Sequence, residues 1–216
     1  MRVLMVDDHL MFLQGMRTLL GVLAPDLEVD TARDQQEALQ HASMNDYEAV
    51  LLDWNLDGCK GHELLAALRD AGCRARVIVV SGETDPRRVG EMFSCGIAGF
   101  IPKAYTGEKM LDALNVTFEG RVFIPGELMA RIERSDNDGR GLSDKELKAR
   151  LDELTSRQLD VFRTMARGLP NKLIARELNI GEATVKTHLT AVFAVLGVSN
   201  RTQAALYASR VGLHVG

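Results

Sequence analysis

The stretch RVLMVDDHLMFLQGMRTLLGVL (residues 2–23) sets the expectation for the fold of the N-terminal part of the chain. Its run Val3–Val6 is short and continuously apolar, as expected of a strand that is buried on both faces of a sheet. After two aspartates, apolar residues recur at helical spacing, and one helical face holds Leu13, Met16, Leu19, Leu20 and Leu23. The stretch therefore predicts a strand followed by an amphipathic helix.

This pattern of an apolar run followed by a helical stretch recurs through the first 120 residues. The further runs are Leu27–Ala32, which is the weakest, Ala49–Leu52, Val77–Val80 and Gly99–Ile101. Five such pairs in succession predict an α/β fold, a doubly wound five-stranded parallel sheet of the flavodoxin-like type with strand order 2-1-3-4-5.

The second part of the chain has a different character. The stretch RIERSDNDGRG (residues 131–141) is polar and charged, which indicates a linker, and everything after it has helical periodicity. We expect three regions: an α/β domain over residues 1–125, a linker over 126–150 and an all-α domain over 151–216.

Composition narrows the class of protein. The net charge of −4 hides an acidic part, residues 1–130 with 20 acidic against 12 basic side chains, and a basic part, residues 142–216 with 7 against 11. This asymmetry favours contact of the second part with a polyanion. The sequence lacks an apolar run long enough to span a bilayer, and its three cysteines lack metal-ligand spacing, so we expect reduced thiols, no membrane partner and a cytoplasmic location.

Carboxylates follow two of the predicted strands. Asp7 and Asp8 end the first strand and Asp53 ends the third, and these strands are neighbours at the point where the strand order reverses. Three converging carboxylates would repel one another, and such a half-hydrated, oxygen-rich site suits Mg²⁺. Asn55 lies two residues past Asp53, where its backbone carbonyl would supply another oxygen ligand.

Ser81 ends the fourth strand and Lys103 ends the fifth, so a hydroxyl and an ammonium reach the same edge of the sheet. A carboxylate can attack phosphorus to form an acyl phosphate, and the transfer requires mainly positioning and neutralisation of the phosphoryl oxygens. Mg²⁺ and Lys103 would supply that neutralisation.

Residues 1–120 resemble the receiver domain of two-component systems, through VDD (6–8), LLDWNLDGCKG (51–61), VVSG (79–82) and GIAGFIPK (96–103). The resemblance implies that Asp53 accepts the phosphoryl group, that Asp7 and Asp8 hold Mg²⁺, and that Ser81 and Lys103 bind the phosphoryl group. Phe100 falls at the aromatic switch position of the family. A sensor histidine kinase is the implied phosphodonor. Two departures are Asp57, where the family usually has proline, and Pro102, which precedes the lysine instead of following it.

The C-terminal part predicts a helix-turn-helix unit. Thr155 and Gln158 have the spacing of a capping box at the start of a helix. Two further helices follow, separated by a turn at Gly181. On the last of them, residues 182–196, the inward positions are Val185, Leu189, Val192, Phe193 and Leu196, and the outward ones are Thr184, Lys186, Thr187 and Thr190.

Residues 154–208 closely resemble the LuxR-type (NarL/FixJ) DNA-binding domain, through motifs such as Thr184-Val185-Lys186 and Leu196-Gly197-Val198. The match implies a four-helix domain that binds double-stranded DNA as a homodimer through the last helix. By position, Lys186, Thr187 and Thr190 are candidates for base edges, and the candidates for phosphate contacts are Lys172, Thr184, His188 and Arg201. The small residues Ala204, Ala205 and Ala208 would suit a helix–helix interface, or pack equally well into the domain's own core.

Three other classes of protein share parts of these patterns. An aspartate-nucleophile phosphatase would carry a second aspartate two residues after the nucleophile, where this chain has Asn55, so we expect no enzyme with an exogenous substrate. A regulator that works without phosphorylation conflicts with the intact pocket, and a diffusible-signal receptor would lack the acceptor aspartate. We therefore expect a transcriptional response regulator, with RNA polymerase as a candidate further partner.

Overall fold

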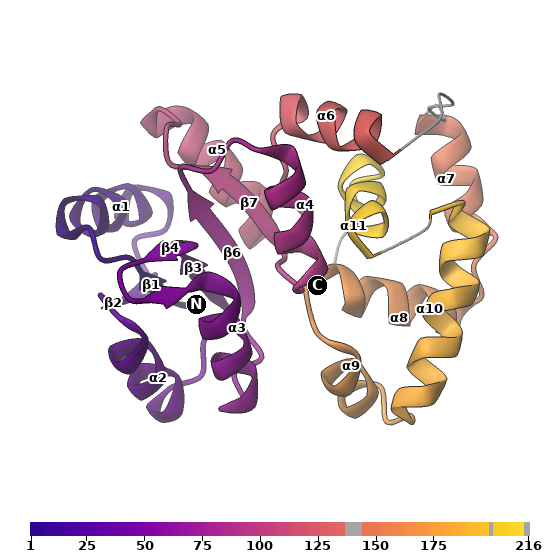
Figure 1. Ribbon diagram of the computed structural model, residues 1–216, viewed down its shortest axis with the longest axis horizontal. Coiled ribbons are helices and arrows are strands. Elements are labelled where there is room, and N and C mark those ends of the chain that lie inside the picture. Colours follow the sequence, from indigo (N-terminus) through magenta and orange to yellow (C-terminus); the bar gives the residue numbers. More distant parts are fainter. Residues whose placement is uncertain (137–143, 199–200, 214–216) are drawn as a thin grey trace. The chain divides into compact units, whose positions relative to one another are not determined.

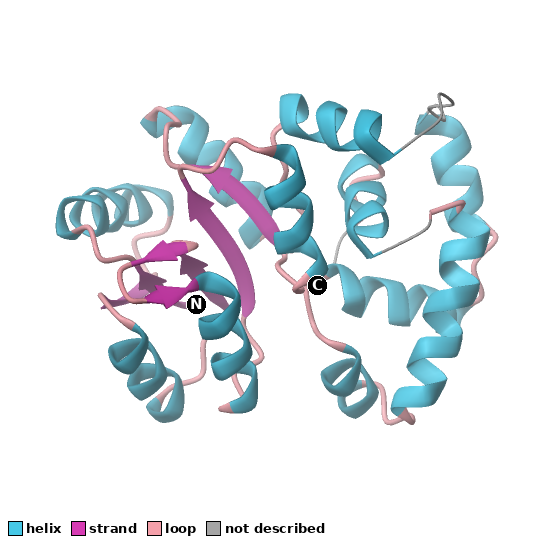
Figure 2. Cartoon of the chain, viewed as in Figure 1, coloured by secondary structure: helices cyan, strands magenta, loops and turns pink. Residues whose placement is uncertain are grey.

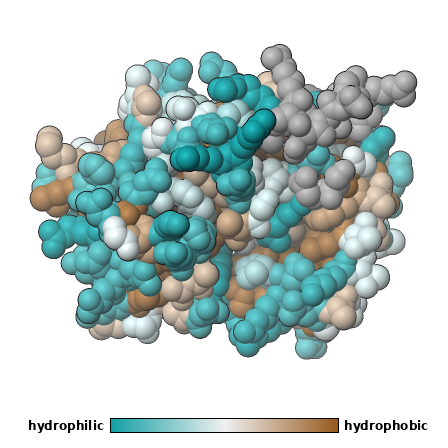
Figure 3. Space-filling view, viewed as in Figure 1, coloured by the Kyte–Doolittle hydropathy of each residue, from teal (hydrophilic) through white to brown (hydrophobic). Residues whose placement is uncertain are grey.

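The computed structural model describes residues 1–136, 144–198 and 201–213. By its internal contacts the chain divides into two compact units, Met1–Glu83 with Gly99–Phe118, and Thr84–Ala98 with Glu119–Gly216. Strands occupy the first unit, whereas the described elements of the second are helical (Figure 2). On the face drawn in Figure 3, hydrophilic side chains predominate and apolar ones form scattered patches. No helix in the described ranges is long and apolar enough to cross a membrane.

The first unit is built on a five-stranded sheet whose strand order is β2-β1-β3-β6-β7 (Figure 1). Every neighbouring pair in it is parallel, which confirms the predicted doubly wound sheet and the 2-1-3-4-5 order. The strands are β1 (Arg2–Val6), β2 (Glu28–Ala32), β3 (Ala49–Leu52), β6 (Arg76–Ser81) and β7 (Gly99–Pro102). The residues of β3 are all buried, as expected of a strand covered on both faces.

Helices cover the two faces of this sheet in pairs (Figure 1). Helix α1 (Leu10–Leu23) packs with α5 (Gly107–Phe118), and α2 (Gln35–Met44) packs with α3 (Gly61–Asp70). The predicted inner face of α1 is largely confirmed, since Leu13, Met16 and Leu20 are buried, while Leu19 and Leu23 are half-buried.

A small hairpin follows β3 and shapes the loop next to the acidic pocket. It pairs β4 (Asn55–Leu56) with β5 (Cys59–Lys60) around Gly58. The φ angle of Gly58 is 77°, a conformation that glycine adopts at little cost. At its end Gly61 lies against the indole of Trp54, where an added Cβ would come within 2.6 Å of Trp54 Cδ2. The close approach of the glycine backbone to this ring fixes the loop that leads from β3 into α3.

The second unit is a helical assembly with its own core. Its elements are α4 (Pro86–Ser94), α6 (Gly126–Asp136), α7 (Asp144–Asp152), α8 (Ser156–Ala166), α9 (Asn171–Glu177), α10 (Glu182–Leu196) and α11 (Arg201–Arg210). The predicted capping box is confirmed, because Gln158 N–H donates to Thr155 Oγ1 at 3.3 Å and Thr155 N–H donates to Gln158 Oε1 at 2.9 Å. In the core, the rings of Phe162 and Tyr207 meet edge to face with centroids 6.3 Å apart.

The stretch predicted as a linker contains helical structure in α6 and α7. The second of these helices takes part in packing, since Leu147 is only 3% exposed and Arg150 Nη1 donates to Leu196 O at 3.0 Å. That bond satisfies a free carbonyl at the C-terminal end of α10 and places a cation at the negative end of the helix. Residues 137–143, from the polar stretch itself, lie outside the described residues.

Helix α11 settles the two interpretations left open for its alanines. Ala204 and Ala208 are fully buried and Ala205 is 5% exposed. They therefore pack inside the protein, and in this structure they do not form an outward face.

Candidate functional site

The carboxylates meet at the carboxyl ends of β1 and β3, as predicted. The main-chain N–H of Asp7 donates to Ala32 O at 3.1 Å, and that of Asp53 donates to Val6 O at 2.8 Å. These bonds continue the ladders of the sheet for one residue and so hold both side chains at the same edge. The side chains of Asp7 and Asp53 are each only 4% exposed.

Lys103 joins these two carboxylates. Its Nζ lies 2.7 Å from Asp7 Oδ2 and 2.7 Å from Asp53 Oδ2. Burial disfavours charge on the ammonium, but the hydrogen bond to Asp53 and the attraction of both carboxylates outweigh it and raise the pKa of Lys103. The lysine is therefore a fixed positive charge beside Asp53, as phosphoryl transfer requires.

The remaining carboxylate oxygens are oriented by main-chain donors. Asn55 N–H donates to Asp53 Oδ1 at 3.1 Å, and Asp57 N–H donates to Asp8 Oδ2 at 3.1 Å. Asp7 Oδ2 and Asp8 Oδ1 are buried, and each has a side-chain nitrogen at 2.7 Å, Lys103 Nζ and His9 Nδ1 respectively. Such oxygens suit a hard divalent cation, so the pocket of Asp7, Asp8 and Asp53 is typical of a Mg²⁺ site.

Ser81 and Phe100 lie on the two strands nearest to Lys103. Both are fully buried. Ser81 Oγ accepts a hydrogen bond from Glu83 N–H at 3.3 Å, and Ser81 O accepts one from Lys103 N–H at 2.9 Å. The backbone therefore couples the hydroxyl-bearing strand end to the lysine-bearing one.

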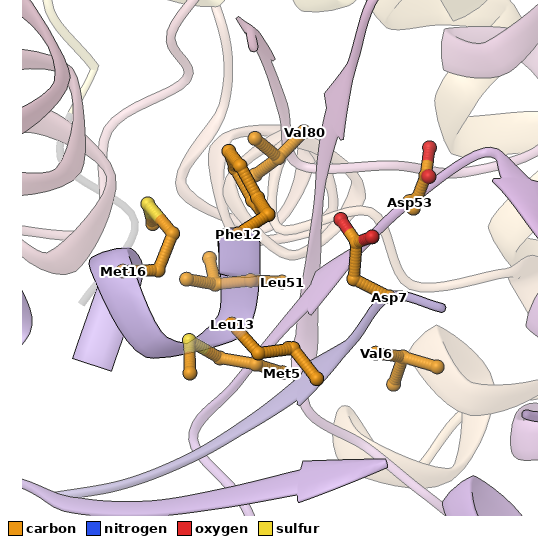
Figure 4. Close-up of a pocket in the computed structure, with 9 residues that line it drawn as sticks. All are labelled: Met5, Val6, Asp7, Phe12, Leu13, Met16, Leu51, Asp53 and Val80. Carbon is orange, nitrogen blue, oxygen red and sulfur yellow. The ribbon is translucent and has the colours of Figure 1, made fainter. Parts of the chain in front are cut away.

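Two cavities adjoin Asp53. A pocket of about 570 Å³ is open to solvent and is lined by His9, Met11, Phe12, Asp53, Asn55, Gly82 and Lys103. A much smaller one, about 10 Å³, lies behind the carboxylates. Figure 4 shows the Asp7 and Asp53 carboxylates side by side with apolar side chains from the sheet and α1 behind them. Asp53 is thus reachable from one side and backed by a dry core on the other.

Two pocket residues were missed at the level of sequence. The Phe12 ring centroid lies 4.7 Å from Lys103 Nζ, a cation–π contact that helps to hold the ammonium in place. His9 Nδ1 lies 2.7 Å from Asp8 Oδ1 and 3.1 Å from Asp7 Oδ1. Attraction to Asp8 is the largest of the influences that raise the pKa of His9. The position of His9 directly after the aspartate pair was the available signal.

In the second unit, α9 and α10 form the predicted helix-turn-helix, with the turn closed by Asn179 at a φ of 52°. On α10 the predicted inward positions Val185, Leu189, Val192 and Leu196 are buried, and Phe193 is half-buried. The predicted outward residues are exposed, namely Thr184, Lys186, Thr187 and Thr190. Lys172 on α9 is also exposed, and His188 is half-buried.

The exposed face of α10 carries two hydroxyl groups and a lysine whose charge is partly compensated by a nearby glutamate. The hydroxyls of Thr187 and Thr190 donate to the carbonyls four residues earlier, at 3.1 Å and 3.0 Å, which leaves their oxygens as acceptors. Lys186 Nζ lies 3.8 Å from Glu182 Oε1, so a phosphate or base that binds Lys186 competes with a neighbouring carboxylate.

Arg201 is placed differently from the other candidate phosphate contacts. Its Nη2 group donates to Met165 O at 2.9 Å and to Leu169 O at 3.0 Å. These carbonyls lie at the turn between α8 and α9, so the guanidinium holds that turn in place. This structural role is sufficient to explain why an arginine occupies position 201, with no contact to DNA required.

Comparison with known proteins finds a family model for each of the two parts of the chain. Residues 3–115 match the model of the response regulator receiver domain, and residues 152–208 match that of the bacterial regulatory proteins of the luxR family. The chain therefore belongs to the two-component response regulators that carry a LuxR-type DNA-binding domain and regulate transcription. The family is one of regulators and not of enzymes that act on an exogenous substrate.

Within this family the chain is similar along most of its length to several regulators. It is 32% identical to the glycerol metabolism activator of Pseudomonas putida, over 97% of this chain and 96% of that protein. It is 30% identical to the nitrate/nitrite response regulator NarL of Escherichia coli K12, over 95% of this chain and 93% of that protein. The structure of RcsB from Salmonella enterica serovar Typhimurium, bound to the promoter rprA with a phosphomimetic, shares the fold with a TM-score of 0.54 at 22% identity, over 98% of this chain and 99% of that one.

Proposed function

We propose that phosphorylation of Asp53 by a sensor histidine kinase, with Mg²⁺ as cofactor, promotes dimerisation and sequence-specific DNA binding by this chain. The observation that supports the proposal best is Lys103 Nζ at 2.7 Å from Asp53, beside two further carboxylates at one edge of the sheet. The proposed phosphoacceptor domain is residues 1–125, the connection 126–150 and the DNA-binding domain 151–216. The proposed location is the cytoplasm.

In the proposed reaction an oxygen of Asp53 attacks the phosphorus of the donor. A P–O bond to the aspartate forms as the bond between phosphorus and the donor's nitrogen or oxygen breaks, and the electron pair leaves with the donor. Asp7, Asp8, Asp53 and the Asn55 carbonyl would hold Mg²⁺, which would neutralise charge on the phosphoryl oxygens. Lys103 stabilises the same oxygens, and the Ser81 hydroxyl would donate to one of them.

On the DNA side, we assign base-edge contacts to Lys186, Thr187 and Thr190, because they are exposed on the second helix of the helix-turn-helix. The proposed phosphate contacts are Lys172, Thr184, His188 and Arg201. A phosphate that binds Arg201 would compete with the hydrogen bonds that its guanidinium donates to the carbonyls of the α8–α9 turn. A protomer with so few groove-facing cations holds DNA weakly at physiological salt, which is why dimerisation is part of the proposal. RNA polymerase is a proposed further partner at promoters, and Phe100 is the proposed switch residue.

The test of the phosphotransfer step is intact-mass spectrometry after incubation with acetyl phosphate and Mg²⁺. The wild type should gain a single phosphoryl group that is labile to base, and Asp53→Asn should gain none. Asp57→Asn is the matched control, since Asp57 is an exposed carboxylate of the same loop, and it should be phosphorylated like the wild type. A phosphoryl group retained by Asp53→Asn would show that the nucleophile is another residue.

A further inference from the structure

The feature that carries a further inference is His9, which extends the acidic pocket with a nitrogen atom. Its Nδ1 lies 2.7 Å from Asp8 Oδ1 and 3.1 Å from Asp7 Oδ1. The ligand atoms of Asp7, Asp8, His9 and Asp53 all lie within 4.8 Å of one another. The imidazole is thus in hydrogen-bond contact with Asp7 and in ion-pair contact with the buried Asp8 Oδ1.

These separations match the ligand shell of a small dication. With metal–ligand distances of about 2.1 Å, neighbouring ligands of an octahedral shell lie about 3.0 Å apart and opposite ligands about 4.2 Å apart. The contacts of His9 with Asp7 and Asp8 fall close to the first value. All separations in the group lie within 4.8 Å, which is about 0.6 Å above the second value, so a closure of the side chains by that amount would complete the shell.

His9 is also accessible to a cation. Its side chain is 68% exposed and lines the open pocket beside Asp53 and Lys103, so a cation that enters this pocket can reach the imidazole. An imidazole nitrogen is a poor partner for Mg²⁺, which prefers oxygen, but a good one for the later first-row transition metals. A site of three carboxylates and one imidazole therefore differs in metal preference from a site built of oxygen alone.

From this geometry we infer that His9 is a nitrogen ligand of the cation site and shifts its selectivity from Mg²⁺ toward later transition-metal dications such as Co²⁺. The inference rests on the cation site of the proposed function and adds a ligand to it. It predicts that removal of the imidazole weakens the binding of transition metals selectively, because the carboxylates that hold Mg²⁺ remain.

The test uses the full-length protein without a phosphodonor. Trp54 directly follows Asp53 and is the single tryptophan of the sequence, so its fluorescence reports cation binding in the pocket. We expect His9→Gln to raise the apparent Kd for Co²⁺ at least tenfold and to change that for Mg²⁺ less than twofold. The matched control is His62→Gln, because His62 is exposed and follows Gly61, which contacts the same indole. This control should change neither constant.

A second readout detects the bond itself. With one equivalent of Mn²⁺, pulsed electron paramagnetic resonance should show modulation from an imidazole nitrogen in the wild type and in His62→Gln, and none in His9→Gln. Unchanged Co²⁺ binding in His9→Gln, equal weakening of both cations, or retained nitrogen modulation would each overturn the inference. Loss of the Mg²⁺ response in the wild type would instead overturn the proposed cation site, and the inference with it.

Discussion

Replacing Lys103 with methionine should have opposite effects on folding stability and on cation affinity. The ammonium lies 2.7 Å from a carboxylate oxygen of Asp7 and of Asp53, both of which are almost completely buried. Methionine keeps much of the length of the side chain and removes its charge. Three carboxylates then face one another without a cation, so the folded state loses free energy while a dication gains a site without a competitor.

The size of both effects follows from the burial. Removing one partner of a buried ion pair costs about 3–5 kcal/mol. The Lys103 side chain keeps 20% exposure, so water screens part of the interaction and we expect a loss of about 2–3 kcal/mol in the free energy of unfolding. If the cation Kd falls about tenfold, saturating Mg²⁺ should return about 1.4 kcal/mol more to the variant than to the wild type.

Urea denaturation followed by Trp54 fluorescence measures both quantities. Because this tryptophan lies in the first unit, its emission reports the unfolding of the unit that contains Lys103. Each protein is unfolded in a chelator and in excess Mg²⁺. Lys109→Met, an exposed lysine of α5, is the control and should change stability by no more than about 0.5 kcal/mol. Wild-type stability of Lys103→Met in the chelator, or a weaker Mg²⁺ response, would refute the reasoning.

Three further predictions concern other parts of the molecule. Burial raises the pKa of Tyr47 to about 12, so the stability that its neutral hydroxyl contributes is complete below the ordinary value of 10.0 and is lost as the pH rises through about 12. The transition that Tyr47→Phe loses from an ultraviolet titration should therefore be one near pH 12, and loss of a transition near pH 10 instead would contradict this. Gly61→Ala should cost about 1–3 kcal/mol and alter the emission of Trp54, because its Cβ would lie 2.6 Å from the indole. Gly15→Ala, which has open space inside α1, should instead stabilise the protein by about 0.5–1 kcal/mol. Lys172→Gln should lower the log–log salt slope of DNA binding by about one per protomer, and an unchanged slope would exclude its phosphate contact.

The part of the account that could be predicted from sequence depends on the parallel sheet. Once strands end at Asp7, Asp53 and Lys103, their side chains must share an edge, because parallel strands place their carboxyl ends together. The structure bears this out with Lys103 in contact with both aspartates. The helical periodicity of residues 182–196 likewise predicted which side chains of α10 are buried and which are exposed.

The roles of Arg201 and of α7 were not predicted because they depend on partners far away along the chain. Arg201 bonds to carbonyls 36 and 32 residues earlier, and nothing local distinguishes such an arginine from one that contacts phosphate. The packing of α7 has the same cause, since Leu147 is buried and Arg150 reaches Leu196 O across 46 residues, although the stretch before it is polar. His9 was missed because a histidine at the start of a helix has no periodic pattern that marks it as a ligand.

The most direct test of the central claim is capture of genomic DNA fragments by the purified full-length protein, followed by sequencing. The wild type and Asp53→Ala are compared with and without acetyl phosphate in the presence of Mg²⁺. We predict that acetyl phosphate enriches a reproducible set of fragments sharing paired half-sites with the wild type, and that Asp53→Ala shows no such enrichment. Equal enrichment by Asp53→Ala, or a wild type whose captured fragments do not respond to acetyl phosphate, would contradict control of DNA binding through Asp53.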